Sequence, residues 1–192
     1  MRRYLQCCTL LIVSFWQEIL GANTQKSLDQ YNIYMNITKN YNKNIRPTDL
    51  FEIYIKMALK QVVSIDEKNQ IMTSNSYVGM TWEDSRLSWN PADFNNVYNI
   101  LMPTSMLWTI DLFIINTANT NGYVAMPSQS LASVSSDGIV YLVFSMTSLK
   151  TRCKINIKYY PFDTQTCSVI IEWLNFTQSD FAINYFHCLD LH

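Results

Sequence analysis

The sequence predicts a mainly β fold: an antiparallel β-sandwich with an Ig-like arrangement and a short N-terminal helix. Two observations support this. From residue 50 onward, short segments alternate apolar and polar side chains and are separated by polar turns, a pattern typical of half-buried antiparallel strands. The 192 residues also include 12 Tyr, 9 Phe and 5 Trp, and aromatic residues are enriched in strands. This length suits one domain with its own core.

The N-terminus is typical of a secretory signal peptide. Arg2 and Arg3 are followed by an uncharged, mostly apolar run over residues 5–16, and Gly21-Ala22 offers small residues for cleavage. A short buried helix is the alternative, and the run is too short for a transmembrane helix. We therefore expect residues 1–22 to be removed and the chain to enter the secretory pathway.

A helix is expected next, before the strands begin. Tyrosine, isoleucine and threonine recur at spacings of three and four over Asp29–Asn44, which predicts a weakly amphipathic helix. The helix should end before Pro47, because the residue preceding proline avoids the helical region.

The remaining elements are expected to be strands. Polar turns are predicted at Asp66–Asn69 and at Ser135–Gly138, the second as a hairpin. The uncharged run Gly138–Leu149 is interpreted as a buried strand. In chain order, the predicted strand segments are 50–56, 61–65, 71–82, 107–115, 138–149, 154–159 and 168–173.

Cysteine content fits an oxidising compartment. Removal of the signal peptide would leave Cys153, Cys167 and Cys188. In such a compartment a Cys153–Cys167 disulfide is favoured, with Cys188 left over.

Charge and motif content exclude several functions. A net charge of −1 suggests neither a nucleic-acid partner nor an anionic membrane surface. The two histidines, His187 and His192, lie in an atypical tail over residues 187–192, and no hydrolase triad, phosphate-binding glycine loop or paired-cysteine metal site is present. With Cys188 and Asp190 the tail could ligate zinc on paper, but a disordered tail is the simpler interpretation. We expect no enzyme activity, no metal and no cofactor.

The segment from Cys153 to Cys167 is the most specific motif. Thirteen residues separate the cysteines, and Pro161-Phe162-Asp163 lies in the second half. This resembles the signature loop of the Cys-loop, or pentameric neurotransmitter-gated, ion channel family, which includes nicotinic acetylcholine, serotonin type 3, GABA-A and glycine receptors. An ordinary disulfide closing a hairpin is the alternative.

Further segments resemble the same family in the same order, over roughly residues 28 to 185. Asp66–Ile71 and Trp89-Asn90-Pro91 look most nicotinic. Met102–Asp111 resembles the segment that leads into the first binding loop, and with Trp173-Leu174 it also resembles the serotonin type 3 branch. A generic secreted adhesion sandwich would not explain this ordered series.

The resemblance implies a function for residues 23–186: the extracellular ligand-binding domain of a subunit at a postsynaptic plasma membrane. Homologous subunits would form a pentamer and bind a small cationic neurotransmitter between them, in a box of aromatic rings. Ligand would shift a closed–open equilibrium of a cation pore. Because the family's third binding loop, last strands and spans are not found, we expect a truncated isoform, a fragment or a gene-model artefact. A soluble acetylcholine-binding-protein-like pentamer and a non-conducting, dominant-negative subunit are the alternatives.

By the same resemblance, the ligand-binding residues would be Trp173, Tyr77, Trp108 and Asp111. Trp173 lies one position earlier than in the family, so either the strand is shorter or Leu174 occupies that position. Trp108, Trp82 and Trp89 are also strong candidates for the core, since large aromatics are commonly buried in sandwiches.

Two further sets of residues complete the predicted site map. For coupling to the membrane domain the resemblance implies Pro161, Phe162 and Asp163 in one loop and Asp66 and Glu67 in another. Glycosylation acceptors occur at two Asn-x-Thr triplets, which begin at Asn36 and Asn175.

The first binding loop has Ile115 where the family has tyrosine. Together with the absence of adjacent cysteines, this substitution favours a complementary role for the chain at the subunit interface.

Overall fold

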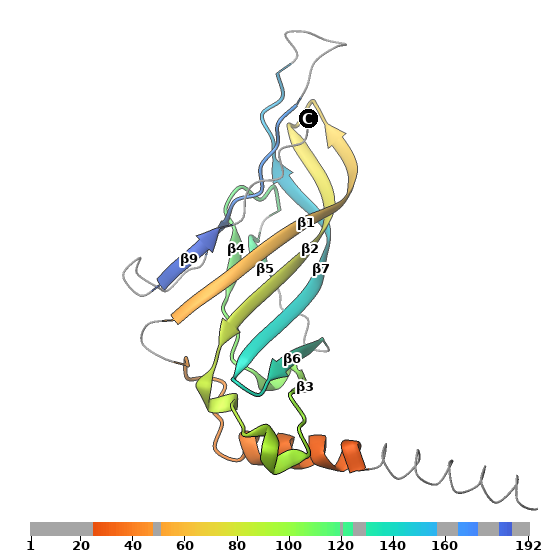
Figure 1. The fold of residues 1–192 in the computed structure, drawn as a ribbon. Coiled ribbons are helices and arrows are strands. Elements are labelled where there is room, and N and C mark those ends of the chain that lie inside the picture. Colours follow the sequence, from red (N-terminus) through yellow and green to blue (C-terminus); the bar gives the residue numbers. More distant parts are fainter. Residues whose placement is uncertain are drawn as a thin grey trace, which may run out of the picture.

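The fold is a two-layered β-sandwich with a helix across one end (Figure 1). For Phe51 and the strand at 181–185, only the backbone is described. The computed structural model describes residues 25–47, 51–119, 121–124, 130–156, 165–172 and 181–185.

Residues 25–38 form the N-terminal helix. Ile33 and Ile37 are buried and anchor its inner face to the core. The helix begins before the predicted Asp29, whose carboxylate accepts a hydrogen bond from the Gln25 side chain one turn earlier. It also ends before the predicted Asn44, because the chain turns after residue 38 and Tyr41 N donates to the Thr38 carbonyl.

The larger sheet has six strands in the order β3-β6-β7-β2-β1-β9. Its pairings are antiparallel, as predicted, except that β9 pairs with β1 in parallel. The strands are β1 (Phe51–Asp66), β2 (Ile71–Glu83), β3 (Asn99–Pro103), β6 (Leu131–Ser135), β7 (Ile139–Arg152) and β9 (Phe181–Tyr185).

The smaller sheet has three short antiparallel strands in the order β5-β4-β8. Short 3-10 turns occur in the connections of the described chain: η1 (Ser85–Leu87) and η2 (Pro91–Phe94) lie between β2 and β3, and η3 (Thr104–Met106) lies between β3 and the smaller sheet. The strands are β4 (Leu112–Ile114), β5 (Tyr123–Val124) and β8 (Ile171–Glu172).

Three predicted strands are shorter or different. Of the segment 107–115, only β4 forms a ladder, because the Trp108 amide donates to the Tyr41 hydroxyl and not to a neighbouring strand. At the start of 154–159, Asn156 N donates to the Gln165 side chain, so 153–156 are not a strand. Within 168–173, the described strand is β8 alone.

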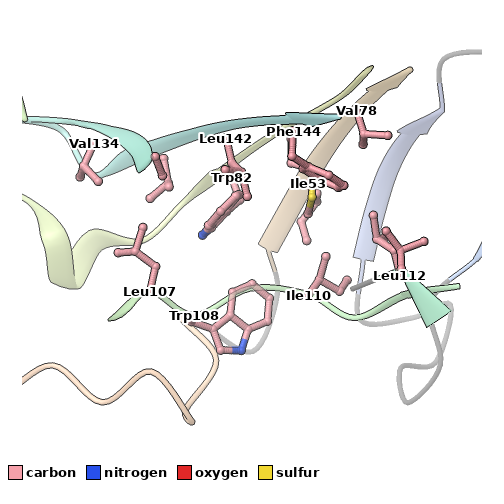
Figure 2. Packing of buried hydrophobic residues seen from close by; sticks show 14 of the residues in the cluster. Ile53, Val78, Trp82, Leu107, Trp108, Ile110, Leu112, Val134, Leu142 and Phe144 are labelled. Atoms are coloured by element: carbon pink, nitrogen blue, oxygen red, sulfur yellow. The ribbon is translucent and has the colours of Figure 1, made fainter. Parts of the chain in front are cut away.

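The hydrophobic core lies between the two sheets (Figure 2). Residues on one face of β2 and β7 point into it, and they meet the segment that leads from Leu107 to Leu112 on the other side. The expected core tryptophans Trp82, Trp89 and Trp108 are all buried. β7 is not buried on both faces as predicted: its side chains alternate between core and solvent, as in an antiparallel sheet with one wet face.

Candidate functional site

The predicted aromatic contact Tyr77 lies on the solvent face of the large sheet. Its neighbour Val78 is fully buried, so the alternation of the strand turns Tyr77 outward, and 42% of it is exposed. Residues paired with Tyr77 on both flanking strands are small, Ala58 on β1 and Ser145 on β7. The ring therefore stands clear of its neighbours, and the Lys60 ammonium lies 5.4 Å from its centroid.

Trp108 lies on the other side of this sheet, inside the core. It is 8% exposed and meets Trp82 edge to face, with ring centroids 6.5 Å apart. Since Trp82 and Tyr77 are on opposite faces of β2, the sheet separates the Trp108 and Tyr77 rings. Within one chain these two predicted ligand contacts do not share a cavity.

Asp111 is exposed just before β4, and its carboxylate Oδ1 accepts a hydrogen bond of 3.1 Å from the Tyr123 hydroxyl. This bond raises the pKa of Tyr123, because ionising the phenol would remove the donor and place two negative charges together. Tyr123 also meets Phe113 edge to face, at 5.4 Å between centroids. Asp111 thus orients an aromatic pair on the small sheet.

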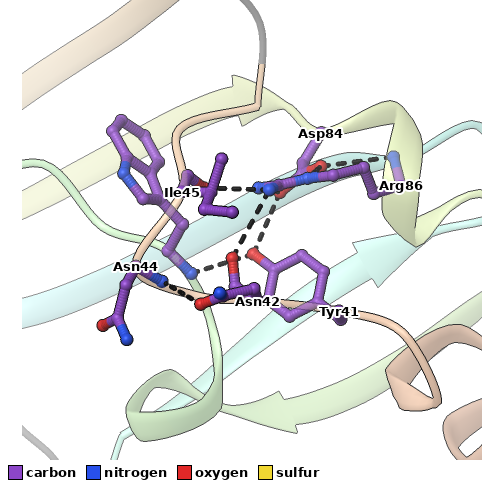
Figure 3. A network of polar contacts seen from close by, with 7 residues as sticks. Tyr41, Asn42, Asn44, Ile45, Asp84 and Arg86 are labelled. Carbon is purple, nitrogen blue, oxygen red and sulfur yellow. Dashed lines mark hydrogen bonds and ion pairs between the residues drawn. The ribbon is translucent and has the colours of Figure 1, made fainter.

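A buried polar network joins the end of the N-terminal helix to the sandwich (Figure 3). The Asp84 side chain is fully buried and accepts from Arg86 through both oxygens, at 2.8 Å from Nε and 2.7 Å from Nη2. The Tyr41 hydroxyl donates to Asp84 Oδ2 at 2.9 Å and accepts from the Trp108 amide at 2.9 Å. Burial, followed by the contacts with Asp84, raises the pKa of Tyr41 to about 12.

Arg86 extends this network to the connection after the helix. Its guanidinium lies 4.7 Å from the Tyr41 ring centroid, and Nη1 donates to the Ile45 carbonyl at 2.9 Å. Sequence reasoning missed this network because Tyr41 is more than 40 residues from both Asp84 and Trp108 in the chain. The closely spaced Asp84 and Arg86 were the one available signal, and such pairs are common on surfaces.

Gly138 closes the hairpin beside the same network. Its φ is +86°, and a Cβ there would lie 2.6 Å from the Asp84 carbonyl oxygen. The Asp84 amide donates to the Gly138 carbonyl at 2.9 Å. The predicted turn at Ser135–Gly138 is confirmed, and its glycine is needed both for the backbone conformation and for this close approach.

The opposite end of the sandwich holds the described part of the predicted coupling region (Figure 1). Asp66 ends β1, and its carboxylate accepts from the backbone and side chain of Asn69 at 2.9 and 2.7 Å. These hydrogen bonds, the backbone one first, lower the pKa of Asp66. Glu67 follows as an exposed turn residue.

The disulfide lies against this turn. Cys153 and Cys167 form the predicted bond, with their Cα atoms 5.1 Å apart, and both are buried. The Cys153 amide donates to the Gln70 carbonyl at 2.9 Å, which ties the disulfide to the β1–β2 turn. The Gln165 side chain accepts a hydrogen bond from the Asn156 amide at 2.9 Å and donates one to the Asn156 carbonyl at 3.0 Å. These two bonds join the segments on either side of the loop.

Several predicted site residues fall outside the described ranges. They are Trp173, Pro161, Phe162, Asp163 and Asn175, and the signal segment and tail fall outside as well.

Of the two predicted glycosylation acceptors, Asn36 lies within the described ranges. It is exposed on the N-terminal helix, one residue before the buried Ile37.

The amino-acid sequence matches a known protein family. The model of the neurotransmitter-gated ion-channel ligand binding domain matches residues 30–187. The chain belongs to this family. Its members are ligand-gated receptors and not enzymes, and the resemblance noted in the sequence is confirmed.

Individual relatives point to one branch of the family. The chain is 34% identical over 164 residues to acetylcholine receptor subunit alpha-type acr-16 of Caenorhabditis elegans, covering 83% of this chain and 32% of that protein. It is 34% identical over 155 residues to neuronal acetylcholine receptor subunit beta-2 of Rattus norvegicus, covering 79% and 30%. The chain spans about a third of the length of the curated relatives it matches.

The N-terminal helix and the short 3-10 turns of the described chain are the helical segments relevant to a membrane span. None of those within the described ranges combines the length and apolar character needed to cross a bilayer.

Proposed function

We propose that this chain is the extracellular ligand-binding domain of a nicotinic acetylcholine-like receptor subunit, binding a small cationic neurotransmitter at an interface between homologous subunits. The family match over residues 30–187 carries this proposal. In the proposed assembly, five such domains form a ring at the outer face of a postsynaptic plasma membrane.

The position of Tyr77 supports a complementary role. An exposed ring on a flat sheet face can contact a cation only on one side, so a site enclosing the ligand needs rings from elsewhere. Trp108 faces the core of the same chain and cannot supply them at that surface. A neighbouring subunit would therefore complete the box, with Trp173 and Asp111 belonging to the opposite, principal face of each chain.

The disulfide end supports a coupling role. The Cys153 amide donates a hydrogen bond to the Gln70 carbonyl. This bond joins the base of the loop that carries Pro161-Phe162-Asp163 to the base of the turn that carries Asp66 and Glu67. Movement of the sandwich on ligand binding would move both together against a membrane domain. The proposed output is a shift of the closed–open equilibrium of a cation pore.

The experiment that tests this function expresses the full chain in secretory cells, alone and with full-length nicotinic-type subunits. Oligomer size, surface delivery and cholinergic radioligand binding are measured together. We expect co-assembly and a binding site that Tyr77→Leu weakens about 30-fold, since a desolvated cation–ring contact is worth about 2 kcal/mol. Tyr31→Leu, at a tyrosine that is also exposed but lies on the N-terminal helix, is the matched control and should leave binding unchanged.

Each other outcome has a definite meaning. Secreted pentamers that bind ligand without partners would identify a soluble binding protein and contradict the coupling role. Co-assembly that lowers the surface delivery of the full-length partners would identify a dominant-negative subunit. A chain that neither assembles nor binds would overturn the proposed function.

A further inference from the structure

Lys60 lies on the same solvent face of the sheet as Tyr77, two residues beyond Ala58, which pairs with Tyr77, and it coincides with an extra residue in β1. Leu59 pairs with Ser76 and Gln61 pairs with Asn75, so Lys60 has no partner across the ladder and forms a β-bulge. Bulges redirect side chains, and here both Lys60 and Gln61 are exposed. The Lys60 ammonium lies 5.4 Å from the Tyr77 ring centroid, within the range of a cation–π contact.

A second irregularity lies on the other side of Tyr77. The β2–β7 register shifts between Ser74 and Ser76, and Asn75 Oδ1 accepts a hydrogen bond of 2.8 Å from Ser148 N, whose residue has a φ of 54°. Tyr77 therefore lies next to interruptions in both of its ladders. Such interruptions commonly occur where a strand aims side chains at a site.

The charge on Lys60 is directed to the ring and not to an acid. Among the residues that the structure describes, no carboxylate forms an ion pair with Lys60. Ala58 and Ser145, which flank Tyr77, are too small to shield the ring. The ring face is thus a cation-accepting surface whose present cation belongs to the chain itself.

We propose that Lys60 is a specificity-determining residue that competes with cationic ligands for the Tyr77 ring, which rests on the proposed use of Tyr77 as a ligand contact. A ring face accepts one cation at a time, because two like charges at that distance repel. A small quaternary ammonium ion must displace Lys60 into water before it binds. The contact lowers the affinity for such an ion about two- to fivefold, the value of an exposed cation–π contact.

The binding experiment uses the assembly of the full chain with its full-length partners and tetramethylammonium as the probe. Lys60→Met should tighten binding about two- to fivefold, and Lys60→Arg should leave it unchanged. In a Tyr77→Leu background, Lys60→Met should have no effect. Lys150→Met removes the same charge from an exposed position on β7 and is the control for the general electrostatic effect.

The outcomes separate this inference from the proposed function. If Tyr77→Leu weakens binding but Lys60→Met leaves it unchanged, competition by Lys60 is overturned and the binding role of Tyr77 stands. The same conclusion follows if Lys150→Met tightens binding as much as Lys60→Met does. If neither the unmodified assembly nor any variant binds the probe, both are overturned. Binding by Lys60→Met alone would support the inference most strongly.

A second measurement needs no assembly. Proton NMR of the full chain should show the Lys60 ε-methylene shifted upfield by the ring current of Tyr77, and Tyr77→Leu should abolish this shift. Tetramethylammonium added to the chain should move the signal toward its value in Tyr77→Leu. An ε-methylene at the same position with and without the ring would overturn the contact.

Discussion

The two ends of the sandwich each contain an aspartate with short hydrogen bonds, but the two aspartates differ in burial. Asp84, at the end covered by the helix, is fully buried and bonded to Arg86 and Tyr41 (Figure 3). Asp66, at the opposite end, is exposed and accepts hydrogen bonds within its own turn, from Asn69 and the Lys68 backbone. Similar distances therefore do not imply similar contributions to stability.

The difference arises from the surroundings of each charge. Water screens the charge of Asp66 and can replace any bond that it loses, so exposed pairs contribute little. Asp84 is shielded from water, so no solvent molecule can replace a hydrogen bond that it loses. Removing either partner of a buried ion pair leaves the charge of the other partner uncompensated. The helix end is thus held by buried charge, whereas the turn end is held mainly by a covalent bond, the Cys153–Cys167 disulfide.

The largest expected effect comes from neutralising Asp84. Asp84→Asn keeps the size of the side chain but leaves the Arg86 guanidinium without its counter-charge, and we expect a loss of about 3 kcal/mol in the free energy of unfolding. Urea denaturation of the full chain measures it. Asp66→Asn is the matched control and should give a much smaller change in the denaturation midpoint. Equal effects at the two positions would contradict the comparison.

A covalent change at the other end should have the next largest effect. Replacing both Cys153 and Cys167 by alanine removes a cross-link that closes a loop of about 15 residues, and we expect a loss of about 3 kcal/mol at most. The effect should be local as well. The Cys153 amide, bonded to Gln70, should exchange with solvent faster, whereas the Trp108 amide at the far end should keep its protection.

Cys188→Ala, which leaves the pair intact, is the control for this experiment. If protection at Trp108 and at Cys153 fell together, the two ends would unfold as one unit and the separation drawn between them would be wrong.

The sequence predicted the parts of the fold that depend on local pattern. Alternation located β1, as two separate segments, and β2; an uncharged run located β7, and Ser135–Gly138 located the hairpin between β6 and β7. The predicted helix bounds, Asp29–Asn44, extend too far toward the C-terminus. The apolar spacing continues beyond residue 38, but there the chain leaves the helix and the Tyr41 hydroxyl bonds to Asp84 and Trp108. Strands β3, β5 and β9 were missed, since they are short and form only where a partner is already in place.

The candidate site divides in the same way. Resemblance named Tyr77, but its contact with Lys60 depends on Ala58 being the β1 residue that pairs with Tyr77, and alternation alone does not predict this register. The Tyr41–Asp84 contact joins residues 43 apart and follows only from the packing of the helix against the sandwich. Trp173 and the Pro161–Asp163 tripeptide remain predictions.

The smallest expected effect on stability comes from Tyr41, and it depends on pH because the Tyr41 hydroxyl ionises. Tyr41→Phe removes the donor to Asp84 and the acceptor for the Trp108 amide, and it should cost about 1 to 2 kcal/mol at neutral pH. The pKa of Tyr41 is raised from 10.0 to about 12, so the folded chain favours the neutral phenol. Its contribution is therefore complete below pH 10 and is lost as the pH rises toward about 12.

Unfolding free energies measured from pH 8 to 12 test whether the contribution of Tyr41 to stability falls as the pH rises. The difference between the unmodified chain and Tyr41→Phe should be constant up to about pH 10 and then shrink, because the unfolded chain releases the proton first. Tyr31→Phe, on the exposed face of the same helix, corrects for the general effect of losing a tyrosine. A difference that stays constant to pH 12 would show that the hydroxyl of Tyr41 does not sense the buried charge of Asp84, and the helix end would then depend on Arg86 alone.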